Sequence, residues 1–249
     1  FEGEGDFDDT LPRLAVSYDM NNNWNFYANY AKGRRSPVVN ADASGVTVTK
    51  AEIVDSYDLG VKYQSPNFTF TGAVFTYQYS DYQQSYTDAE TLQSITVTVG
   101  DSTMSGIEGM ATYHYSDTLS FTTSLGFLDA EFADDTADGT PFQYGGNKFR
   151  LAPEVSGAIN INKLVEMDNW LLDFNWLTSF QSKVYFESSN YPGLWQDTHS
   201  LTDVSMKVSK DNSQFAFEVY VDNLFDKEYL IDAGNTGGGL GIPTFVRGM

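Results

Sequence analysis

The stretch that decides the fold is Trp170–Gln181, whose sequence is WLLDFNWLTSFQ. Large apolar side chains alternate in it with polar ones: Trp170, Leu172, Phe174, Trp176 and Phe180 stand opposite Asp173, Asn175, Ser179 and Gln181. Successive side chains of a β-strand point to opposite faces, so this run predicts a strand with one apolar and one polar face. The same alternation recurs in Trp24–Tyr30, Tyr57–Tyr63 and Phe215–Asp222. The sequence therefore predicts an all-β protein.

We expect about ten strands in the chain. They lie near residues 11–18, 24–32, 55–63, 68–79, 105–115, 118–131, 149–161, 170–186, 198–209 and 215–223. Several have about ten residues or more, as a tilted strand needs to cross a bilayer, whereas strands of soluble proteins usually have five or six. Phe68–Tyr79 is less regular because it carries aromatic residues at both parities, which predicts a bulge or a two-sided aromatic strand.

The connections between these strands alternate in length. The short ones fall at residues 20–23, 64–67, 116–117, 162–169 and 210–214, and the long ones at 33–54, 81–104, 132–148, 187–197 and 224–249. Short periplasmic turns and long external loops are typical of outer-membrane barrels, so the pattern predicts a transmembrane antiparallel up-and-down β-barrel. Aromatic residues near the short turns then form an interfacial girdle: Trp24, Tyr63, Phe68, Tyr115 and Trp170. The alternative is a soluble β fold in which these rings belong to the core.

Composition narrows the functional classes. The chain has 14 basic and 34 acidic residues, a formal net charge of -20, which argues against a nucleic-acid partner because phosphate binding needs basic patches. Aromatic residues make up 15% of the chain, which favours strands. Cysteine is absent, which excludes a disulfide scaffold and a thiolate metal site.

Near the end of the chain, an alternating strand runs into the turn Asn223-Leu224-Phe225-Asp226, and Tyr229 follows. This stretch, Val219–Tyr229, resembles the penultimate-strand signature of TonB-dependent outer-membrane receptors. Four other segments are similar to earlier strands of the receptor barrel: Phe26–Pro37, Tyr57–Tyr63, Ala73–Gln83 and Gly106–Gly109. Met110 departs from the pattern, since the family more often has an acidic residue there. The resemblance covers nearly the whole chain.

The resemblance implies a barrel of about 22 strands around a plug. Residues 1–249 then correspond to its C-terminal portion, and we expect the plug domain, the early strands and the closing strand to belong to a longer protein. Such a receptor lies in the outer membrane of a Gram-negative bacterium, in contact with lipid and lipopolysaccharide. It takes up a scarce ligand such as a ferric siderophore, driven by the TonB–ExbB–ExbD complex through the plug. It is not an enzyme, and it has no cofactor of its own, because iron arrives inside its chelate.

The candidate ligand-binding residues lie in the expected external loops. Arg34 and Arg35 are rare cations where a strand rises into a long loop, and two guanidiniums suit a carboxylate or catecholate. Pairing with acidic neighbours or with the plug is the alternative that we favour. Tyr185, Tyr191 and Trp195 are aromatic candidates for ligand contact or for anchoring the loop at the membrane interface. Asn223, Leu224, Phe225, Asp226 and Tyr229 are expected to be structural.

The sequence gives little support for a catalytic site or a calcium site. His114 and His199 are far apart in sequence, and no spacing singles out a nucleophile for either. Asp134–Gly139 resembles the start of a calcium loop, but Gly145 stands where a bidentate glutamate is needed. Three alternatives remain open: a porin-like or autotransporter-type passive barrel, an outer-membrane barrel enzyme, and a soluble β protein.

Overall fold

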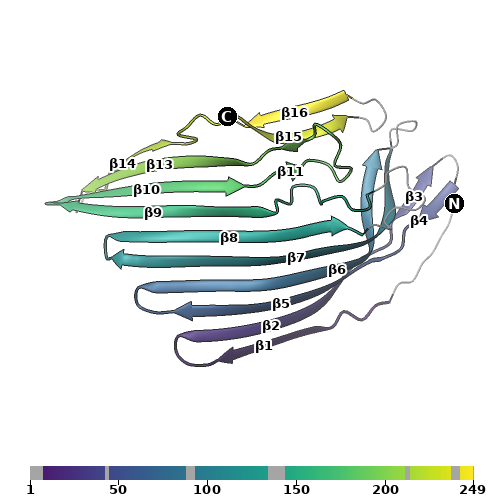
Figure 1. The fold of residues 1–249 in the computed structure, drawn as a ribbon, viewed down its shortest axis with the longest axis horizontal. Helices are drawn as coiled ribbons and strands as arrows, with labels where there is room; N and C mark the ends of the chain where they lie inside the picture. Colours follow the sequence, from purple (N-terminus) through teal and green to yellow (C-terminus); the bar gives the residue numbers. More distant parts are fainter. Residues whose placement is uncertain are drawn as a thin grey trace.

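The computed structural model describes residues 8–42, 45–87, 93–133, 144–210, 214–236 and 242–248. Its main element is one antiparallel sheet of ten strands, arranged in chain order (Figure 1). The strands are β1 (Arg13–Asp19), β2 (Trp24–Arg35), β5 (Glu52–Gln64), β6 (Phe68–Thr87), β7 (Ser94–Ser116), β8 (Leu119–Phe132), β9 (Val155–Met167), β10 (Trp170–Gln181), β13 (His199–Lys210) and β14 (Ala216–Val221). This confirms the predicted all-β, up-and-down order. The sheet is open, with β1 and β14 at its edges.

Three small hairpins accompany the sheet. They are β3 (Val39–Asp42) with β4 (Gly45–Val48), β11 (Val184–Tyr185) with β12 (Trp195–Gln196), and β15 (Tyr229–Thr236) with β16 (Ile242–Gly248). The last pair corrects the expectation that residues 224–249 form only a loop. Thr244, Phe245 and Val246 are strong strand formers, and they pair with the outgoing strand β15.

Short and long connections lie at opposite ends of the sheet (Figure 1). We call these the turn end and the loop end. At the turn end, local side chains satisfy the backbone: the Asn21 side-chain oxygen accepts from the N–H groups of Asn23 and Trp24. The Ser65 hydroxyl both accepts from Phe68 N and donates to Phe68 O. As predicted, the short connections therefore lie at one end of the sheet and the long connections at the other.

Three predicted boundaries are wrong. Residues 81–104 are mostly strand, because β6 and β7 continue as a hairpin beyond a register shift near Asp81, whose φ is 56°. Residues 149–161 and 162–169 were expected as a strand and a turn, but the strand is β9, Val155–Met167. Asn162 was expected to begin the turn, yet it lies in the strand and its Nδ2 donates to Asp173 Oδ1 across the sheet at 2.6 Å. The neighbouring Asn160 Nδ2 donates to Asn175 Oδ1 at 3.1 Å. Residues 170–186 likewise divide into β10 and β11.

Cross-strand pairing sorts the side chains into two faces, because directly opposed residues share a face. Leu172 is opposite both Val165 and Val208, whereas Asn175 is opposite Asn162 and Ser205. The same registers extend through the whole sheet. We call the two sides the apolar face and the polar face. Residues of the apolar face include Val16, Phe26, Leu59, Val74, Ile107, Leu125, Ile159, Phe174, Trp176 and Val219.

The apolar face is solvent-exposed in the structure. Leu59 is 59% exposed, Ile107 58% and Trp176 41%. The buried apolar clusters of the described residues lie near the loop end instead. At the turn end, Trp24 lies 4.6 Å from Tyr63 between ring centroids, and Tyr63 lies 6.0 Å from Phe68. These rings therefore occupy neighbouring positions, as a girdle requires.

Candidate functional site

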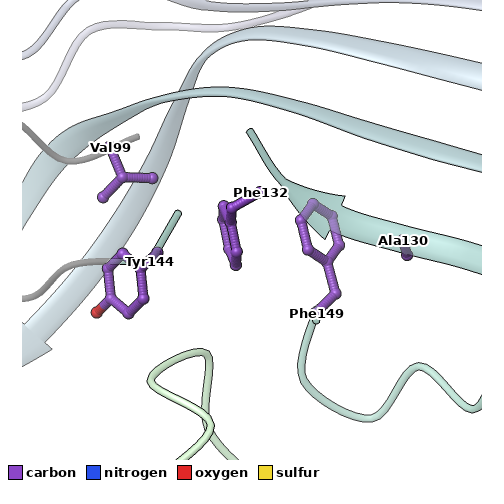
Figure 2. Packing of buried hydrophobic residues seen from close by; sticks show 5 residues of the cluster. All are labelled: Val99, Ala130, Phe132, Tyr144 and Phe149. Carbon is purple, nitrogen blue, oxygen red and sulfur yellow. The ribbon is translucent and has the colours of Figure 1, made fainter. Parts of the chain in front are cut away.

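The loop end of the polar face carries a buried group of side chains that we call the aromatic cluster: Val99, Ala130, Phe132, Tyr144 and Phe149. Figure 2 shows Phe132 between Tyr144 and Phe149, and the rings of Phe132 and Phe149 lie 4.6 Å apart. Tyr82 adds its ring at 5.5 Å from Phe132 and 5.3 Å from Phe149. The cluster thus packs the loop ends of β6, β7 and β8 against the residues that precede β9.

The segment that precedes β9 joins this cluster because its backbone forms hydrogen bonds with the end of β8. Phe132 N donates to Asn147 O at 3.0 Å, and Phe149 N donates to Ala130 O at 3.1 Å. Asn190, from the connection between β10 and β13, accepts from Lys148 N at 2.8 Å and donates to Lys148 O at 2.9 Å. Two long connections are therefore joined by hydrogen bonds between the Asn190 side chain and the Lys148 backbone.

The side chain of Lys148 points away from the aromatic cluster and forms ion pairs with three carboxylates. Its Nζ lies 2.7 Å from Asp129, 3.2 Å from Glu131 and 3.3 Å from Glu154. The hydrogen bond to Asp129 holds the pKa of the Lys148 ammonium above its ordinary value, with Glu131 and Glu154 acting in the same direction. The local excess of two negative charges marks a polar rim above the apolar face.

The structure does not bring Arg34 and Arg35 together. They are neighbours in β2 and therefore point to opposite faces of the sheet. Arg34 Nε lies 3.3 Å from Asp9 Oδ2, and its side chain is 13% exposed. Arg35 Nη1 donates to Gln83 O at 3.2 Å and lies 3.9 Å from Glu52 Oε2. Both guanidiniums have acidic neighbours, and they do not form a single bidentate clamp.

Sequence reasoning missed Gln83, which organises the surroundings of Arg35. Its side chain is almost completely buried, and its amide nitrogen donates to Ser36 O at 3.0 Å and Lys50 O at 2.8 Å. Its backbone N–H donates to Glu52 Oε2 at 2.7 Å. Gln83 thus ties the connection after β2 to the β6–β7 hairpin and leaves Arg35 half-exposed. No pattern in the sequence identifies this residue.

Two of the three aromatic candidates come together. Tyr185 and Trp195 are paired across β11 and β12, with ring centroids 6.4 Å apart. Lys183 joins them: its Nζ lies 4.5 Å from the Tyr185 ring and 4.0 Å from the Trp195 ring, distances typical of cation–π contacts. Tyr191 is 56% exposed and takes no part in this group. Lys183 was missed, although its i, i+2 spacing from Tyr185 predicts a shared face.

A second apolar group lies behind this hairpin: Val184, Phe186, Leu194 and Ala233, with Leu230 packed against it. Strand β15 is held there by a hydrogen bond from Leu230 N to Gln196 Oε1 at 2.6 Å. The ring of Tyr229 stacks on His199, with centroids 5.1 Å apart and planes inclined by 17°. A pocket of about 330 Å³ lies between β15 and the loop ends of β10 and β13.

The two histidines occupy opposite ends of the sheet. His114 pairs with Ser120 beside the β7–β8 turn, and His199 begins β13 at the loop end. His199 Nδ1 lies 3.2 Å from the backbone oxygen of Asp197, so this contact is not the carboxylate partner that a catalytic triad needs. The possible calcium loop, Asp134–Gly139, lies outside the described residues.

The Asn-Leu-Phe-Asp turn has a structural role. Asn223 has a φ of 49°, accepts from Lys227 N at 2.8 Å and donates to Lys227 O at 3.0 Å, so its side chain closes the turn. Asn223 N also donates to Asp203 Oδ1 at 2.8 Å, and Leu224 N donates to Thr202 O at 2.7 Å. Phe225 is 70% exposed. Asp226, with a φ of 49°, donates its N–H to Asn223 O at 2.8 Å. The motif directs the chain from β14 toward β15.

The middle of the polar face is a shallow trough of about 500 Å³. Small side chains line much of it, among them Thr71, Ala73, Ser124 and Ser156, with Glu108 as the one charged residue of its lining. Close packing requires a glycine at one position of this lining: a Cβ on Gly157 would stand 2.6 Å from the backbone oxygen of Ser124, whereas a Cβ on Gly126 would meet its nearest atom at 3.5 Å. Larger apolar side chains, among them Met110, Leu125 and Phe180, complete its lining.

Comparison with known proteins identifies the architecture. Residues 2–224 match the family model described as TonB dependent receptor-like, beta-barrel. The pesticin receptor of Yersinia pestis is 24% identical over 234 residues, which cover 92% of this chain and 33% of the relative. The pesticin receptor of Yersinia enterocolitica is 23% identical over the same length. The chain thus spans about a third of the length of these curated relatives.

Solved structures show the same fold. The crystal structure of the ferric yersiniabactin uptake receptor FyuA from Yersinia pestis has a TM-score of 0.80 at 22% identity, covering 96% of this chain and 35% of that chain. The ferric preacinetobactin receptor BauA from Acinetobacter baumannii has a TM-score of 0.72 at 18% identity, covering 95% of this chain and 35% of that chain. At these identities the similarity concerns the barrel fold alone.

Proposed function

This chain belongs to the TonB-dependent receptor-like β-barrel family, and on that basis we propose that it forms part of the wall of an outer-membrane receptor that takes up a scarce ligand by TonB-coupled active transport. The family consists of receptors and transporters, not enzymes. The ligand we propose is a ferric siderophore or a similar iron complex. Relatives named as receptors or transporters of ferric chelates support this substrate class.

The observation that carries the membrane location is the exposed apolar face. Large side chains such as Leu59, Ile107 and Phe174 cover it in strands of 12 to 23 residues, long enough to cross a bilayer when tilted. A soluble sheet buries such a face, because exposed apolar patches of this extent drive association. We therefore place the apolar face against the lipid and lipopolysaccharide of a Gram-negative outer membrane, with the loop end outside.

An open sheet of ten strands needs further strands before it can lie in a membrane. The edge strands β1 and β14 are exposed along their whole length. In hydrocarbon every backbone polar group must have a partner, so an open sheet is not stable in a bilayer. We propose that residues 1–249 are the C-terminal portion of a barrel of about 22 strands, completed by early strands, a closing strand and a plug domain. The plug would connect the receptor to the TonB–ExbB–ExbD complex.

Ligand recognition is proposed at the loop end. Arg35 is half-exposed on the polar face and suits a carboxylate or catecholate. Lys183 with Tyr185 and Trp195 offers a cation between two rings. Arg34, already paired with Asp9, and the exposed Tyr191 are weaker candidates. Iron would be bound by its chelator, so the receptor needs no metal ligands or cofactor of its own.

Uptake of labelled iron tests this function. The complete gene product that contains this chain is expressed in a Gram-negative host lacking its own siderophore receptors, in strains with and without TonB. Cells are given ⁵⁵Fe as ferric citrate or as a ferric catecholate or phenolate complex. We expect uptake of at least one complex, abolished in the strain without TonB. Equal uptake in both strains would instead support a passive, porin-like barrel.

A further inference from the structure

The pocket beneath β15 has well-defined walls. One wall consists of Ser179 and Gln181 of β10 with Leu201 and His199 of β13, which form two directly opposed pairs on the polar face. The opposite wall is formed by residues 229–231 of β15. The volume of about 330 Å³ is within the range of small-molecule sites, roughly 300–1,000 Å³. The pocket is therefore large enough for a compact ring system.

The lining of this pocket is uncharged. Leu151, Phe180, Val184, Phe186, Leu201 and Ile231 supply most of its surface. Polar groups come from Ser179, Gln181, His199 and Tyr229, and no Asp, Glu, Lys or Arg is among its lining residues. This is unusual in a chain with a net charge of -20. Because burying an unpaired charge is strongly unfavourable, such a pocket selects neutral groups.

The pocket is also held open by contacts on both sides. Behind it, Val184, Phe186, Leu194 and Ala233 form the second apolar cluster. At its rim, Tyr229 stacks on His199, and Leu230 N donates to Gln196 Oε1. A preformed site loses little entropy when a rigid ring enters it.

We propose that this pocket binds a flat, uncharged ring of the ligand, with the ring against the apolar wall and the Gln181 amide hydrogen-bonded to a polar substituent. This deepens the proposed function, on which it rests for the identification of the ring as part of the transported ligand. Anionic chelating groups are excluded from the pocket. Those anionic groups bind instead to the cations outside the pocket, Arg35 and Lys183.

Two probes of the same shape and different charge test the proposal. The complete gene product in detergent micelles is titrated with 2-naphthamide, which is neutral, and with 2-naphthoate, which is anionic, with empty micelles as the blank. We expect saturable binding of naphthamide, at least tenfold tighter than that of naphthoate. Equal or tighter binding of naphthoate would overturn the proposal.

Variants locate the binding. Leu201→Trp fills the pocket and should weaken naphthamide binding at least tenfold. Leu171→Trp introduces the same side chain on the same face at the far end of β10 and should leave binding unchanged. Retained binding by a folded Leu201→Trp protein contradicts the proposal. If that variant does not fold, methyl NMR of the wild-type protein replaces it: Leu201 and Ile231 methyl signals should shift with naphthamide, and shifts confined to other methyl groups contradict the proposal.

The outcomes separate this inference from the receptor function. Loss of naphthamide binding in Leu201→Trp, in a protein that shows no TonB-dependent iron uptake, supports the pocket and rejects the transport proposal. TonB-dependent uptake by a protein that does not bind naphthamide supports transport and rejects the pocket.

Discussion

The imidazole of His199 stacks on the phenol ring of Tyr229, with centroids 5.1 Å apart and planes inclined by 17°. His199 is the first residue of β13 in the main sheet, and Tyr229 is the first residue of β15 in the separate hairpin. The stack therefore attaches the hairpin to the sheet directly after the Asn-Leu-Phe-Asp turn.

Tyr229→Ala should loosen this attachment. Aromatic pairs contribute roughly 0.5–1.5 kcal/mol beyond their buried area, so we expect about two- to twelvefold faster hydrogen exchange at the amide of Leu230. Mass-spectrometric exchange on the detergent-solubilised protein measures it. Tyr191→Ala, at an exposed ring outside this contact, is the control and should not change exchange there. Unchanged exchange in Tyr229→Ala would show that the stack does not hold β15.

Asn223→Ala should open the turn after β14, because it removes two hydrogen bonds to Lys227 and places a Cβ-bearing residue without a local partner at a φ of 49°. We expect a local loss of roughly 1–3 kcal/mol from the hydrogen bonds, seen as faster exchange at Lys227. Asn223→Gly is the matched variant: it loses the same hydrogen bonds but tolerates the backbone angle. The glycine variant should therefore be less affected than the alanine variant, and the reverse order would contradict this account.

Gly157→Ala and Gly126→Ala form a pair that tests close packing of the sheet. A Cβ at Gly157 would lie 2.6 Å from Ser124 O and 2.8 Å from the Phe180 ring, whereas one at Gly126 meets its nearest atom, Ser156 Oγ, at 3.5 Å. We expect Gly157→Ala to destabilise the protein by roughly 1–3 kcal/mol, as overpacking does. Gly126→Ala should be neutral. Urea unfolding in micelles measures both, and equal midpoints would argue against the register between β8 and β9.

Labelling distinguishes the two faces directly. Residues 1–249 contain no cysteine, so single cysteines at Leu172, Phe174 and Trp176 are the only ones in this part of the protein, and any cysteine elsewhere in the complete protein is first replaced by serine. In the complete protein in outer-membrane lipid, these labels should be accessible to oxygen dissolved in hydrocarbon, while labels at Asp173 and Asn175 should not. If both sets report water, the membrane location is wrong.

Lys148→Gln should free the segment around the aromatic cluster by removing three ion pairs. The pKa of Lys148 is raised in the folded protein, so its contribution is complete below the ordinary lysine pKa of about 10.4 and is lost only as the pH rises above that value. We expect about 1 kcal/mol after solvent screening, or roughly fivefold faster subtilisin cleavage between residues 144 and 154. The difference from wild type should be constant from pH 7 to 9 and shrink above pH 10. A difference that is largest at high pH would contradict the ion-pair explanation.

Prediction from the sequence succeeded for features that depend on the order of residues within one strand. The alternation in Trp170–Gln181 fixed both the strand and its faces, because a period of two leaves no other amphipathic arrangement. It failed at β9, where residues 162–169 were expected to form a turn, although Asn162 lies in the strand and bonds to Asp173 of β10. At the site, Tyr185 and Trp195 were identified and do meet, whereas Gln83 and Lys183 emerge only from contacts across connections.

The sequence by itself determined that the protein is an antiparallel sheet of amphipathic strands with turns at one end and loops at the other, because these features depend on residue periodicity and turn chemistry within short segments. Tertiary structure alone decided the arrangement of the loop end. It sent Arg34 and Arg35 to opposite faces with separate partners, joined Lys148 to Asn190, and placed an uncharged pocket beneath Tyr229. These contacts join residues from different connections, and their geometry depends on the packing of the whole sheet rather than on any local pattern.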